Sequence, residues 1–176
     1  MELNKIIGHI SQDNIDTLQN YAKLVAKGKE KLFIADIGTC AEKSAISLAL
    51  ADEKIEVLTV DPSPSRVLRP NLHKMKVNDR IIFFKETSDE FAKRDIELDM
   101  CFIDGIHSYQ GVKDDIKGIV TKVKKDGYVL FHDANLYDGV RKAIKEYEGK
   151  YYKFIEETGG QLEPVKEGSI YVAKKL

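Results

Sequence analysis

Residues 99–107 read DMCFIDGIH, and this stretch decides how the rest of the chain can be organised. Its first half is a short apolar run bounded by turn residues, which is typical of a strand buried on both faces of a parallel sheet. Asp104 and His107 follow it, at the position where open α/β sheets bind ligands. A carboxylate that can hold a cation and an imidazole that can take a proton form a candidate reaction centre. The alternative is a turn in which Asp104 caps the next helix and His107 is merely exposed.

The composition indicates one soluble domain that spans residues 1–176. Hydrophobic residues make up 43% and charged residues 32%, and the formal net charge is −1. Without a basic excess, neither nucleic acid nor an anionic membrane is an expected partner. No apolar run is long enough to cross a bilayer, and the N-terminus lacks the regions of a signal peptide. Cys40 and Cys101 have no metal-binding spacing, which is typical of reduced thiols, so we expect a cytoplasmic protein.

The first strand–turn–helix unit lies at residues 31–51. Residues 31–39 predict a strand that ends in a glycine turn, and the alanine- and leucine-rich residues 41–51 predict a helix directly after it. Gly38 would let the backbone come close to a bound ligand. The dinucleotide fingerprint needs three glycines, but Cys40 and Glu42 are among the residues that fill this turn. A pyrophosphate is therefore poorly supported, which argues against NAD and nucleoside triphosphates.

The second strand, residues 56–61, ends in Asp61 at about the 20-residue distance at which a carboxylate accepts the hydroxyls of a ribose. The alternative is that Asp61 caps a helix ahead of Pro62 and Pro64. The match of strand, turn, helix, strand and terminal acid favours the ribose, so the sequence predicts a nucleoside ligand without a pyrophosphate.

The next segments continue the alternation of helices and strands. Residues 65–76 predict a basic helix with Val67 and Leu68 facing inward, and residues 80–85 predict a third strand. Thr87 and Ser88 follow this strand. Their hydroxyls could meet a ligand base, although N-capping of a short helix is the commoner use.

The fourth strand, at residues 99–103, is followed by a predicted long helix. Apolar positions at helical spacing extend this helix from residue 108 to residue 125, with Lys122, Lys124 and Lys125 at its carboxyl end. Asp126 and Gly127 then predict a turn into the fifth strand.

The fifth strand, residues 128–131, ends in His132 and Asp133. If it neighbours the fourth strand, Asp104, His132 and Asp133 supply oxygen and nitrogen donors to one divalent cation. The alternative is structural, with Asp133 as the cap of the next helix.

The two ends of the chain complete the predicted fold. Residues 11–27 predict an amphipathic helix that either packs on the sheet or roofs a site, so residues 1–28 are a candidate lid. Residues 137–149 predict a last helix, and the strands at residues 151–156 and 168–173 predict an antiparallel hairpin closed by a loop with Gly159, Gly160 and Pro164. The expected class is α/β, with a mostly parallel seven-stranded sheet flanked by helices.

Four motifs in this order carry a resemblance to a known family. They are DIGT at residues 36–39, SAISLA at 44–49, DGIHSY at 104–109, and KKDGY at 124–128 followed by HD at 132–133. Together the chain resembles a class I S-adenosylmethionine-dependent methyltransferase of Rossmann-like fold, and most closely the small type 24 family.

The resemblance implies a cofactor site with a role for each part of the ligand. Asp36, Gly38 and Thr39 would frame the methionine part, with Ser44 near its carboxylate, and Asp61 would hold the ribose. The cofactor-binding residues implied in this way are Asp36, Gly38, Thr39, Ser44, Asp61, Pro62, Thr87, Ser88 and Asp104.

The resemblance also implies a metal site and a general base. Related metal-dependent O-methyltransferases hold a cation on the acids that correspond to Asp104 and Asp133, and carry a base at the position of His107. Two departures stand out: Glu42 replaces the second glycine of the turn, and Asp133 lies between His132 and Ala134.

The expected activity is methyl transfer from S-adenosylmethionine to a hydroxyl of a small molecule such as a sugar, a phenol or a natural product. A divalent cation such as Mg²⁺ on Asp104 and Asp133 would assist, and His107 would take the proton. Two alternatives remain: a binding protein that has lost transfer activity, and a hydroxylase-like metal enzyme on the same scaffold. The oligomeric state is open, and a homodimer is compatible with this interpretation.

Overall fold

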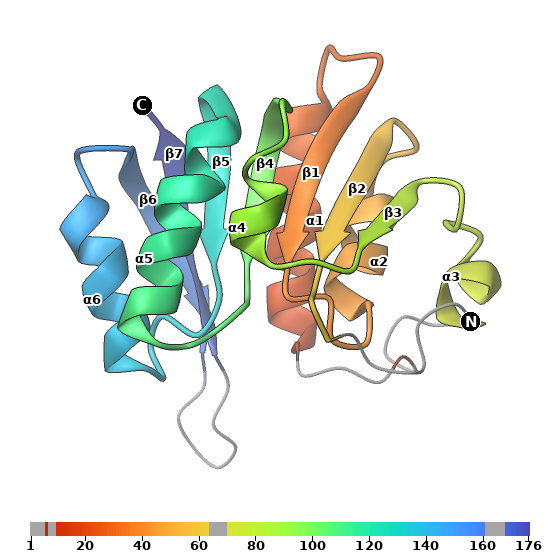
Figure 1. Cartoon of the computed structure of the whole chain (residues 1–176). Coiled ribbons are helices and arrows are strands. Elements are labelled where there is room, and N and C mark those ends of the chain that lie inside the picture. The colour runs from red at the N-terminus through yellow and green to blue at the C-terminus, as the bar shows by residue number, and fades with distance from the viewer. Residues whose placement is uncertain (1–5, 7–9, 64–69, 161–167) are drawn as a thin grey trace.

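The computed structural model describes residues 6, 10–63, 70–160 and 168–176 of the chain (Figure 1). Its strands are β1 (Leu32–Ile37), β2 (Ile55–Val60), β3 (Ile81–Phe84), β4 (Leu98–Ile103), β5 (Val123–Phe131), β6 (Tyr152–Gly159) and β7 (Ser169–Lys175). Its helices are α1 (Gln12–Ala26), α2 (Lys43–Ala51), α3 (Pro70–Met75), α4 (Ser88–Phe91), α5 (Tyr109–Gly118), the 3₁₀ turn η2 (Val120–Lys122) and α6 (Asp138–Tyr147).

All seven described strands form one sheet in the order β3-β2-β1-β4-β5-β7-β6. Strands β1 to β5 are parallel, and β7 runs antiparallel to both β5 and β6. The mostly parallel Rossmann-like sheet and the antiparallel C-terminal hairpin predicted from the sequence are therefore confirmed. Pro164 and residues 65–69 of the predicted third helix, Val67 and Leu68 among them, lie outside the described residues.

Helices cover both faces of the sheet (Figure 1). On one face, Leu18 of α1 and Ile46 of α2 join one apolar core, and on the other Ile116 of α5 and Ile144 of α6 join a second. Every residue of β4 is buried, as its apolar sequence predicts for a central strand. Within the described part of the chain, every helix falls short of the length and apolarity needed to cross a membrane.

The strand order determines where on the sheet a binding site is expected. The chain moves outward from β1 to β2 and β3 and then returns to the other side of β1 with β4, so the order reverses between β1 and β4. Open α/β sheets bind ligands beyond the carboxyl ends of their strands at such a switch point. The last residues of β1, β4 and β5 are in register, with Ile37 beside Ile103 and Ile103 beside Phe131. The turns that follow these strands therefore share one edge.

The predicted helix over residues 108–125 is wrong in its second half. Helix α5 ends at Gly118, and Lys124 already belongs to β5, where its Nζ lies 3.1 Å from Asp99 Oδ1. The predicted turn at Asp126 and Gly127 is an irregularity within β5, and a Cβ on Gly127 would lie 2.6 Å from the Asp99 carbonyl oxygen. Contact with the neighbouring strand thus outweighs the local helical pattern.

Candidate active site

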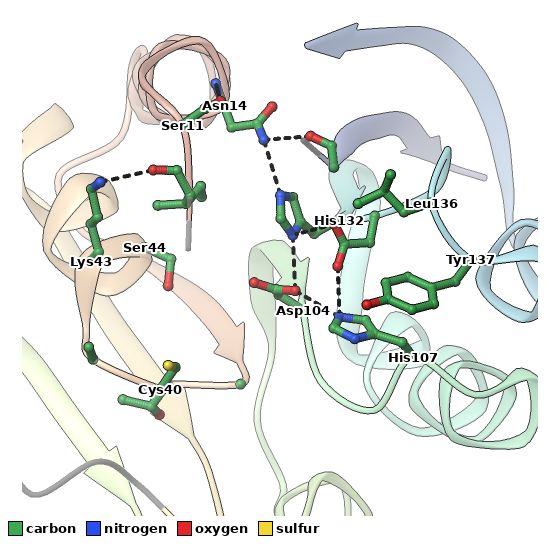
Figure 2. A pocket seen from close by; sticks show the side chains of 16 residues that line it. Ser11, Asn14, Cys40, Lys43, Ser44, Asp104, His107, His132, Leu136 and Tyr137 are labelled. Carbon is green, nitrogen blue, oxygen red and sulfur yellow. Dashed lines mark hydrogen bonds and ion pairs between the residues drawn. The ribbon is translucent and has the colours of Figure 1, made fainter. Parts of the chain in front are cut away.

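Two neighbouring cavities open at the carboxyl edge of the sheet, and both are lined by Gly38, Cys40 and Asp104. We call the larger of the two, of about 580 Å³, the acceptor cavity. Its other lining residues are Ile10, Ser11, Asn14, Thr39, Ala41, Lys43, Ser44, His107, His132, Asp133, Leu136, Tyr137 and Gly168 (Figure 2). The nucleoside cavity, as we call the smaller one (about 480 Å³), is lined among others by Val60, Asp61, Pro62, Thr87, Ser88 and Ile106. Both volumes lie in the range of small-ligand sites.

The structure thus places most of the predicted cofactor residues on the walls of these two adjoining cavities. Asp61, Pro62, Thr87 and Ser88 line the nucleoside cavity, and Thr39 and Ser44 line the acceptor cavity. Their contacts with a cofactor stay predictions. Asp36 differs from the others, because it lines neither cavity and is fully buried.

Gly38 is required by the protein itself as well as predicted to lie beside a ligand. Its φ is +97°, and a Cβ built on it would lie 2.1 Å from the carbonyl oxygen of Asp104. The loop after β1 presses against the end of β4, and any side chain would separate them. The close approach of a ligand to Gly38 stays a prediction.

The rest of this loop is strained and is tied to β2. Cys40 (φ 42°) and Glu42 (φ 68°) both adopt the left-handed conformation that glycine favours. The backbone N–H of Cys40 donates to Asp61 Oδ2 at 3.1 Å, and that of Ser63 donates to Asp61 Oδ1 at 2.7 Å. Asp61 therefore fixes the loop, and the remaining lone pairs of its carboxylate are available to a ligand.

Asp36 is connected to the acceptor cavity through a pair of threonine hydroxyl groups. Thr59 Oγ1 donates to Asp36 Oδ2 at 2.6 Å, and Thr39 Oγ1, on the cavity wall, lies 2.7 Å from Thr59 Oγ1. The other carboxylate oxygen of Asp36 is buried without a hydrogen-bond partner among the described residues. Burial, helped by the charges of Asp104 and Asp61, raises the pKa of Asp36 to about 7 against the hydrogen bonds from Thr59 and Ser44.

Glu42, the replacement for the second glycine, is buried as well. Its exposed fraction is 2%, and one of its carboxylate oxygens has no hydrogen-bond partner within the described residues. Burial raises the pKa of Glu42 to about 7. The end of β1 and the loop after it thus contain two acids, Asp36 and Glu42, whose surroundings favour the neutral form.

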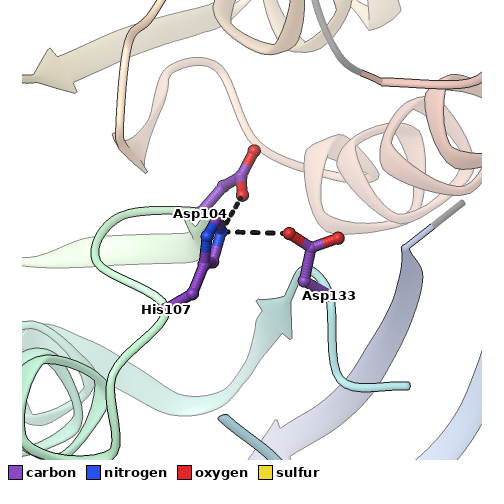
Figure 3. A group of neighbouring side chains, drawn as sticks. All are labelled: Asp104, His107 and Asp133. Carbon is purple, nitrogen blue, oxygen red and sulfur yellow. Dashed lines mark hydrogen bonds and ion pairs between the residues drawn. The ribbon is translucent and has the colours of Figure 1, made fainter. Parts of the chain in front are cut away.

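Four side chains from the ends of two strands, β4 and β5, meet in the acceptor cavity (Figures 2 and 3). His107 Nε2 lies 3.3 Å from Asp104 Oδ1 and 3.0 Å from Asp133 Oδ2. His132 Nδ1 lies 3.1 Å from Asp104 Oδ1 and 3.3 Å from Asp133 Oδ1. We call these four residues the carboxylate–imidazole cluster. The sequence predicted that they are neighbours, and the structure brings all four together.

The cluster shifts the protonation of its members. Hydrogen bonds to Asp104 and Asp133, with the charges of both, outweigh burial and raise the pKa of His107 to about 9. Burial opposes charge on Asp104, but hydrogen bonds from both histidines hold the pKa of this carboxyl below its ordinary value. Burial likewise disfavours a charged His132, and the bond to Asp104 with the nearby carboxylates still raises its pKa.

The structural alternatives for the two acids are wrong. Ser108, not Asp104, caps α5, because its side chain accepts from the backbone N–H of Gly111. Helix α6 begins after Tyr137 without a side-chain cap, so the Asp133 carboxylate does not cap it. By contrast, the capping alternative for Thr87 is confirmed, since Thr87 caps α4 while it also lines the nucleoside cavity.

The cluster offers donors to a divalent cation. Asp104, His107 and Asp133 each place one ligand atom within 4.8 Å of the others. Two carboxylates and an imidazole fit a divalent transition metal, and carboxylates alone also suit Mg²⁺. The predicted set contained His132 as the imidazole, whereas in the structure His107 completes the group.

Three residues of the site were missed. Tyr137 stacks on His107 with ring centroids 4.6 Å apart and planes within 7°. Asn14 and Gly168 lie behind His132, and Asn14 Nδ2 is 3.0 Å from His132 Nε2 and 2.7 Å from the Gly168 carbonyl oxygen. One feature of the sequence pointed to Asn14: this residue lies four positions before Leu18, on the buried face of α1. A polar side chain on such a face needs a partner.

Solved structures share the fold. An rRNA methylase from Streptococcus thermophilus superposes with a TM-score of 0.73 at 11% identity, over 96% of this chain and 99% of that chain. A candidate caffeoyl-CoA O-methyltransferase from Staphylococcus aureus gives 0.72 at 15% identity, over 98% and 87%. The N-methyltransferase NodS from Bradyrhizobium japonicum WM9, in complex with S-adenosyl-L-homocysteine, gives 0.68 at 14% identity, over 99% and 94%. At these identities the likeness shows the fold alone.

Sequence comparison gives the family. A search of curated proteins gave no match. A family model described as a methyltransferase domain, of type 24, matches residues 35–134, from the end of β1 to the end of the carboxylate–imidazole cluster. Because this match covers more than half of the chain, the chain belongs to the type 24 family of methyltransferase domains.

Proposed function

We propose that this protein transfers a methyl group from S-adenosylmethionine to a hydroxyl of a small molecule. The observation that carries the proposal is the meeting of the two cavities at Gly38, Cys40 and Asp104. One cavity has the acid and hydroxyls suited to a nucleoside, and the other has carboxylates and imidazoles. A nucleoside-linked donor and its acceptor can therefore meet at Asp104.

The nucleoside cavity suits the adenosine part of the cofactor. Asp61 is anchored by two backbone N–H groups and keeps lone pairs for the ribose hydroxyls. Ile106 and Pro62 provide apolar surface for a base, and the hydroxyls of Thr87 and Ser88 lie on the same wall.

The methionine part would cross the shared wall toward Ser44 and Lys43. Lys43 Nζ lines the acceptor cavity, where it donates to the Ile10 carbonyl oxygen at 2.9 Å. A lysine ammonium with further donor capacity is a suitable partner for an amino-acid carboxylate. The sulfonium of the bound cofactor would supply an electrophilic methyl group.

The chain's own contribution is alignment and proton removal. Tyr137 holds the plane of the His107 ring, and Asp104 and Asp133 hold its Nε2 at the mouth of the acceptor cavity. The two carboxylates raise the pKa of His107 to about 9, and a cation held by them would offset this rise, so that His107 could take the proton of an acceptor hydroxyl. Asp104 and Asp133 would hold a divalent cation, which would lower the pKa of that hydroxyl.

The test is a two-step measurement on the whole chain. Calorimetry with S-adenosylmethionine measures binding, and release of S-adenosylhomocysteine is then followed with sugars, phenols, amines and RNA as acceptors, with and without Mg²⁺. RNA and amines belong in the panel because the fold is shared with an rRNA methylase and an N-methyltransferase. Binding without release would make the protein a cofactor-binding protein, and absence of binding would refute the proposal.

His107→Gln tests the role of the base. Removal of a general base costs about 10²–10⁴-fold in rate, so product release should fall by at least about a hundredfold while cofactor affinity stays the same. His73→Gln is the matched control, because His73 is an exposed histidine on α3, away from the residues that line either cavity. Undiminished transfer by His107→Gln would show that His107 is not the base.

A further inference from the structure

We propose that Asn14, on the first helix, is a positioning residue of the site. It holds the ring of His132 with the proton on Nδ1, directed at Asp104 and Asp133, so that His132 braces the carboxylates and His107 is the imidazole that serves the reaction. The part of this proposal that concerns methyl transfer rests on the proposed function. The part that concerns the contacts of Asn14 with His132 does not depend on it.

The argument begins at the carbonyl group of Gly168. A carbonyl oxygen only accepts hydrogen bonds, and Asn14 places one end of its side-chain amide 2.7 Å from this oxygen. The reverse orientation would put the amide oxygen against the carbonyl oxygen. The Gly168 carbonyl therefore fixes which end of Asn14 is the NH₂ group.

The orientation of the amide then fixes the ring. The same Asn14 Nδ2 lies 3.0 Å from His132 Nε2, in a buried contact between α1 and the end of β5 (Figure 2). An amide nitrogen only donates, so His132 Nε2 accepts and carries no proton. The proton of the neutral ring is on Nδ1, which faces Asp104 Oδ1 at 3.1 Å and Asp133 Oδ1 at 3.3 Å.

Two influences act on His132 in opposite directions. The carboxylates favour a charged ring, whereas a second proton on Nε2 would face the hydrogens of the Asn14 amide. Packing against Gly159 keeps Asn14 in place despite these opposing influences. Its carbonyl side is in close contact with Gly159, where a Cβ would lie 2.4 Å from Asn14 Oδ1.

Gly168 braces the same assembly from the other side. A Cβ on Gly168 would lie 1.7 Å from Asp133 Oδ1, so its backbone is packed directly against this carboxylate. Gly168, directly before β7, and Asn14, on α1, thus hold His132 and Asp133 between them. With Nδ1 protonated, His132 cannot offer that nitrogen as a ligand or as a base, which leaves His107 as the imidazole available to the reaction.

The test is ¹⁵N NMR of the histidine rings at neutral pH, on the full chain without cofactor or metal. The chain has four histidines, so single replacements assign the ring signals. The wild-type His132 should show a protonated Nδ1 and a bare Nε2. A wild-type His132 with a protonated Nε2 would overturn the proposal without any variant.

Two variants and a control sharpen the result. In Asn14→Asp, a carboxylate faces Nε2 and should draw a proton onto it, while Asn14→Leu should remove the preference for either nitrogen. Thr17→Val is the control, because Thr17 lies one turn along the same helix and contacts Thr158 rather than the cluster. It should leave the His132 signals unchanged, and circular dichroism checks that each variant is folded.

Activity gives an independent second readout. Groups that orient catalytic or metal-binding side chains contribute about 10–100-fold, so Asn14→Asp should lower kcat about tenfold with little change in the KM for S-adenosylmethionine. If the NMR signals of Asn14→Asp match those of wild type, the positioning role is refuted whatever the activity. If the signals change as expected but wild type transfers no methyl group, only the proposed function fails.

Discussion

Asp99 and Asp36 are both buried aspartates of central strands, but they lie at opposite ends of the sheet and in opposite surroundings. The Asp99 carboxylate accepts hydrogen bonds from the Lys29 ammonium at 2.7 Å, the Phe33 backbone N–H at 2.9 Å and the Lys124 ammonium at 3.1 Å. These bonds outweigh its burial, and they hold the pKa of Asp99 below its ordinary value.

Among the residues that the structure describes, no ammonium or guanidinium group pairs with Asp36. Within the same part of the chain, one of its oxygens accepts from the Thr59 hydroxyl and the other has no hydrogen-bond partner, and its pKa rises to about 7. A fully paired buried acid contributes to stability, whereas an underpaired one reduces stability and is retained where a ligand makes use of it. The comparison indicates that the amino end of the sheet is built for stability and the carboxyl end for binding.

The largest stability effect should come from Asp99→Asn. The neutral amide weakens three hydrogen bonds to a buried site, and the free energy of unfolding at pH 7 should fall by about 3 kcal/mol. Because the pKa of Asp99 is depressed in the folded state, this contribution is present above the unfolded pKa and is lost as the pH falls through the folded pKa. Urea denaturation measures it.

Asp126→Asn is the control for Asp99→Asn. Asp126 is paired with Lys174 at 3.0 Å, but its side chain is 65% exposed, so its removal should change little. Equal effects of the two substitutions would contradict the assignment of the amino end as the stabilising end.

Asp36→Asn should have the opposite sign and a smaller size. The folded-state pKa of about 7 lies above the unfolded value, so the wild type loses stability as the pH rises from about 4 to about 7. The variant lacks this loss, so its stability relative to wild type should increase by about 2 kcal/mol between pH 5 and pH 8. Urea denaturation at both pH values checks this, and an advantage that does not depend on pH would count against it.

Glu42→Gln should show the smallest effect. The pKa of Glu42 is also about 7, so the stability of the variant relative to wild type should increase by about 1 kcal/mol between pH 5 and pH 8, while the left-handed backbone strain is the same in both. Thermal unfolding at the two pH values measures this. A variant less stable than wild type at pH 8 would show that Glu42 is used in its charged form.

Most of the fold could be predicted from the sequence, because apolar runs and turn residues are local signals. The segment from residue 123 to residue 127 could not. Its lysines continue a helical pattern, but pairing with β4 and the contact of Lys124 with Asp99 make it a strand.

The residues of the site that follow a strand could be predicted from the sequence. Asp104, His107, His132 and Asp133 each follow a predicted strand, so parallel topology alone places them together. Asn14 was not predictable as a site residue, because it is 118 residues from His132 and 154 from Gly168 along the chain. Only the packing of α1 on the finished sheet creates these contacts.

The contact between Gly38 and the Asp104 carbonyl has a consequence for changing acceptor preference. At this contact the partition between the two cavities is main chain on both sides, so no side chain can be shortened or enlarged there. Redesign of the acceptor cavity can instead use Ser11, Leu136 and Tyr137, which line it.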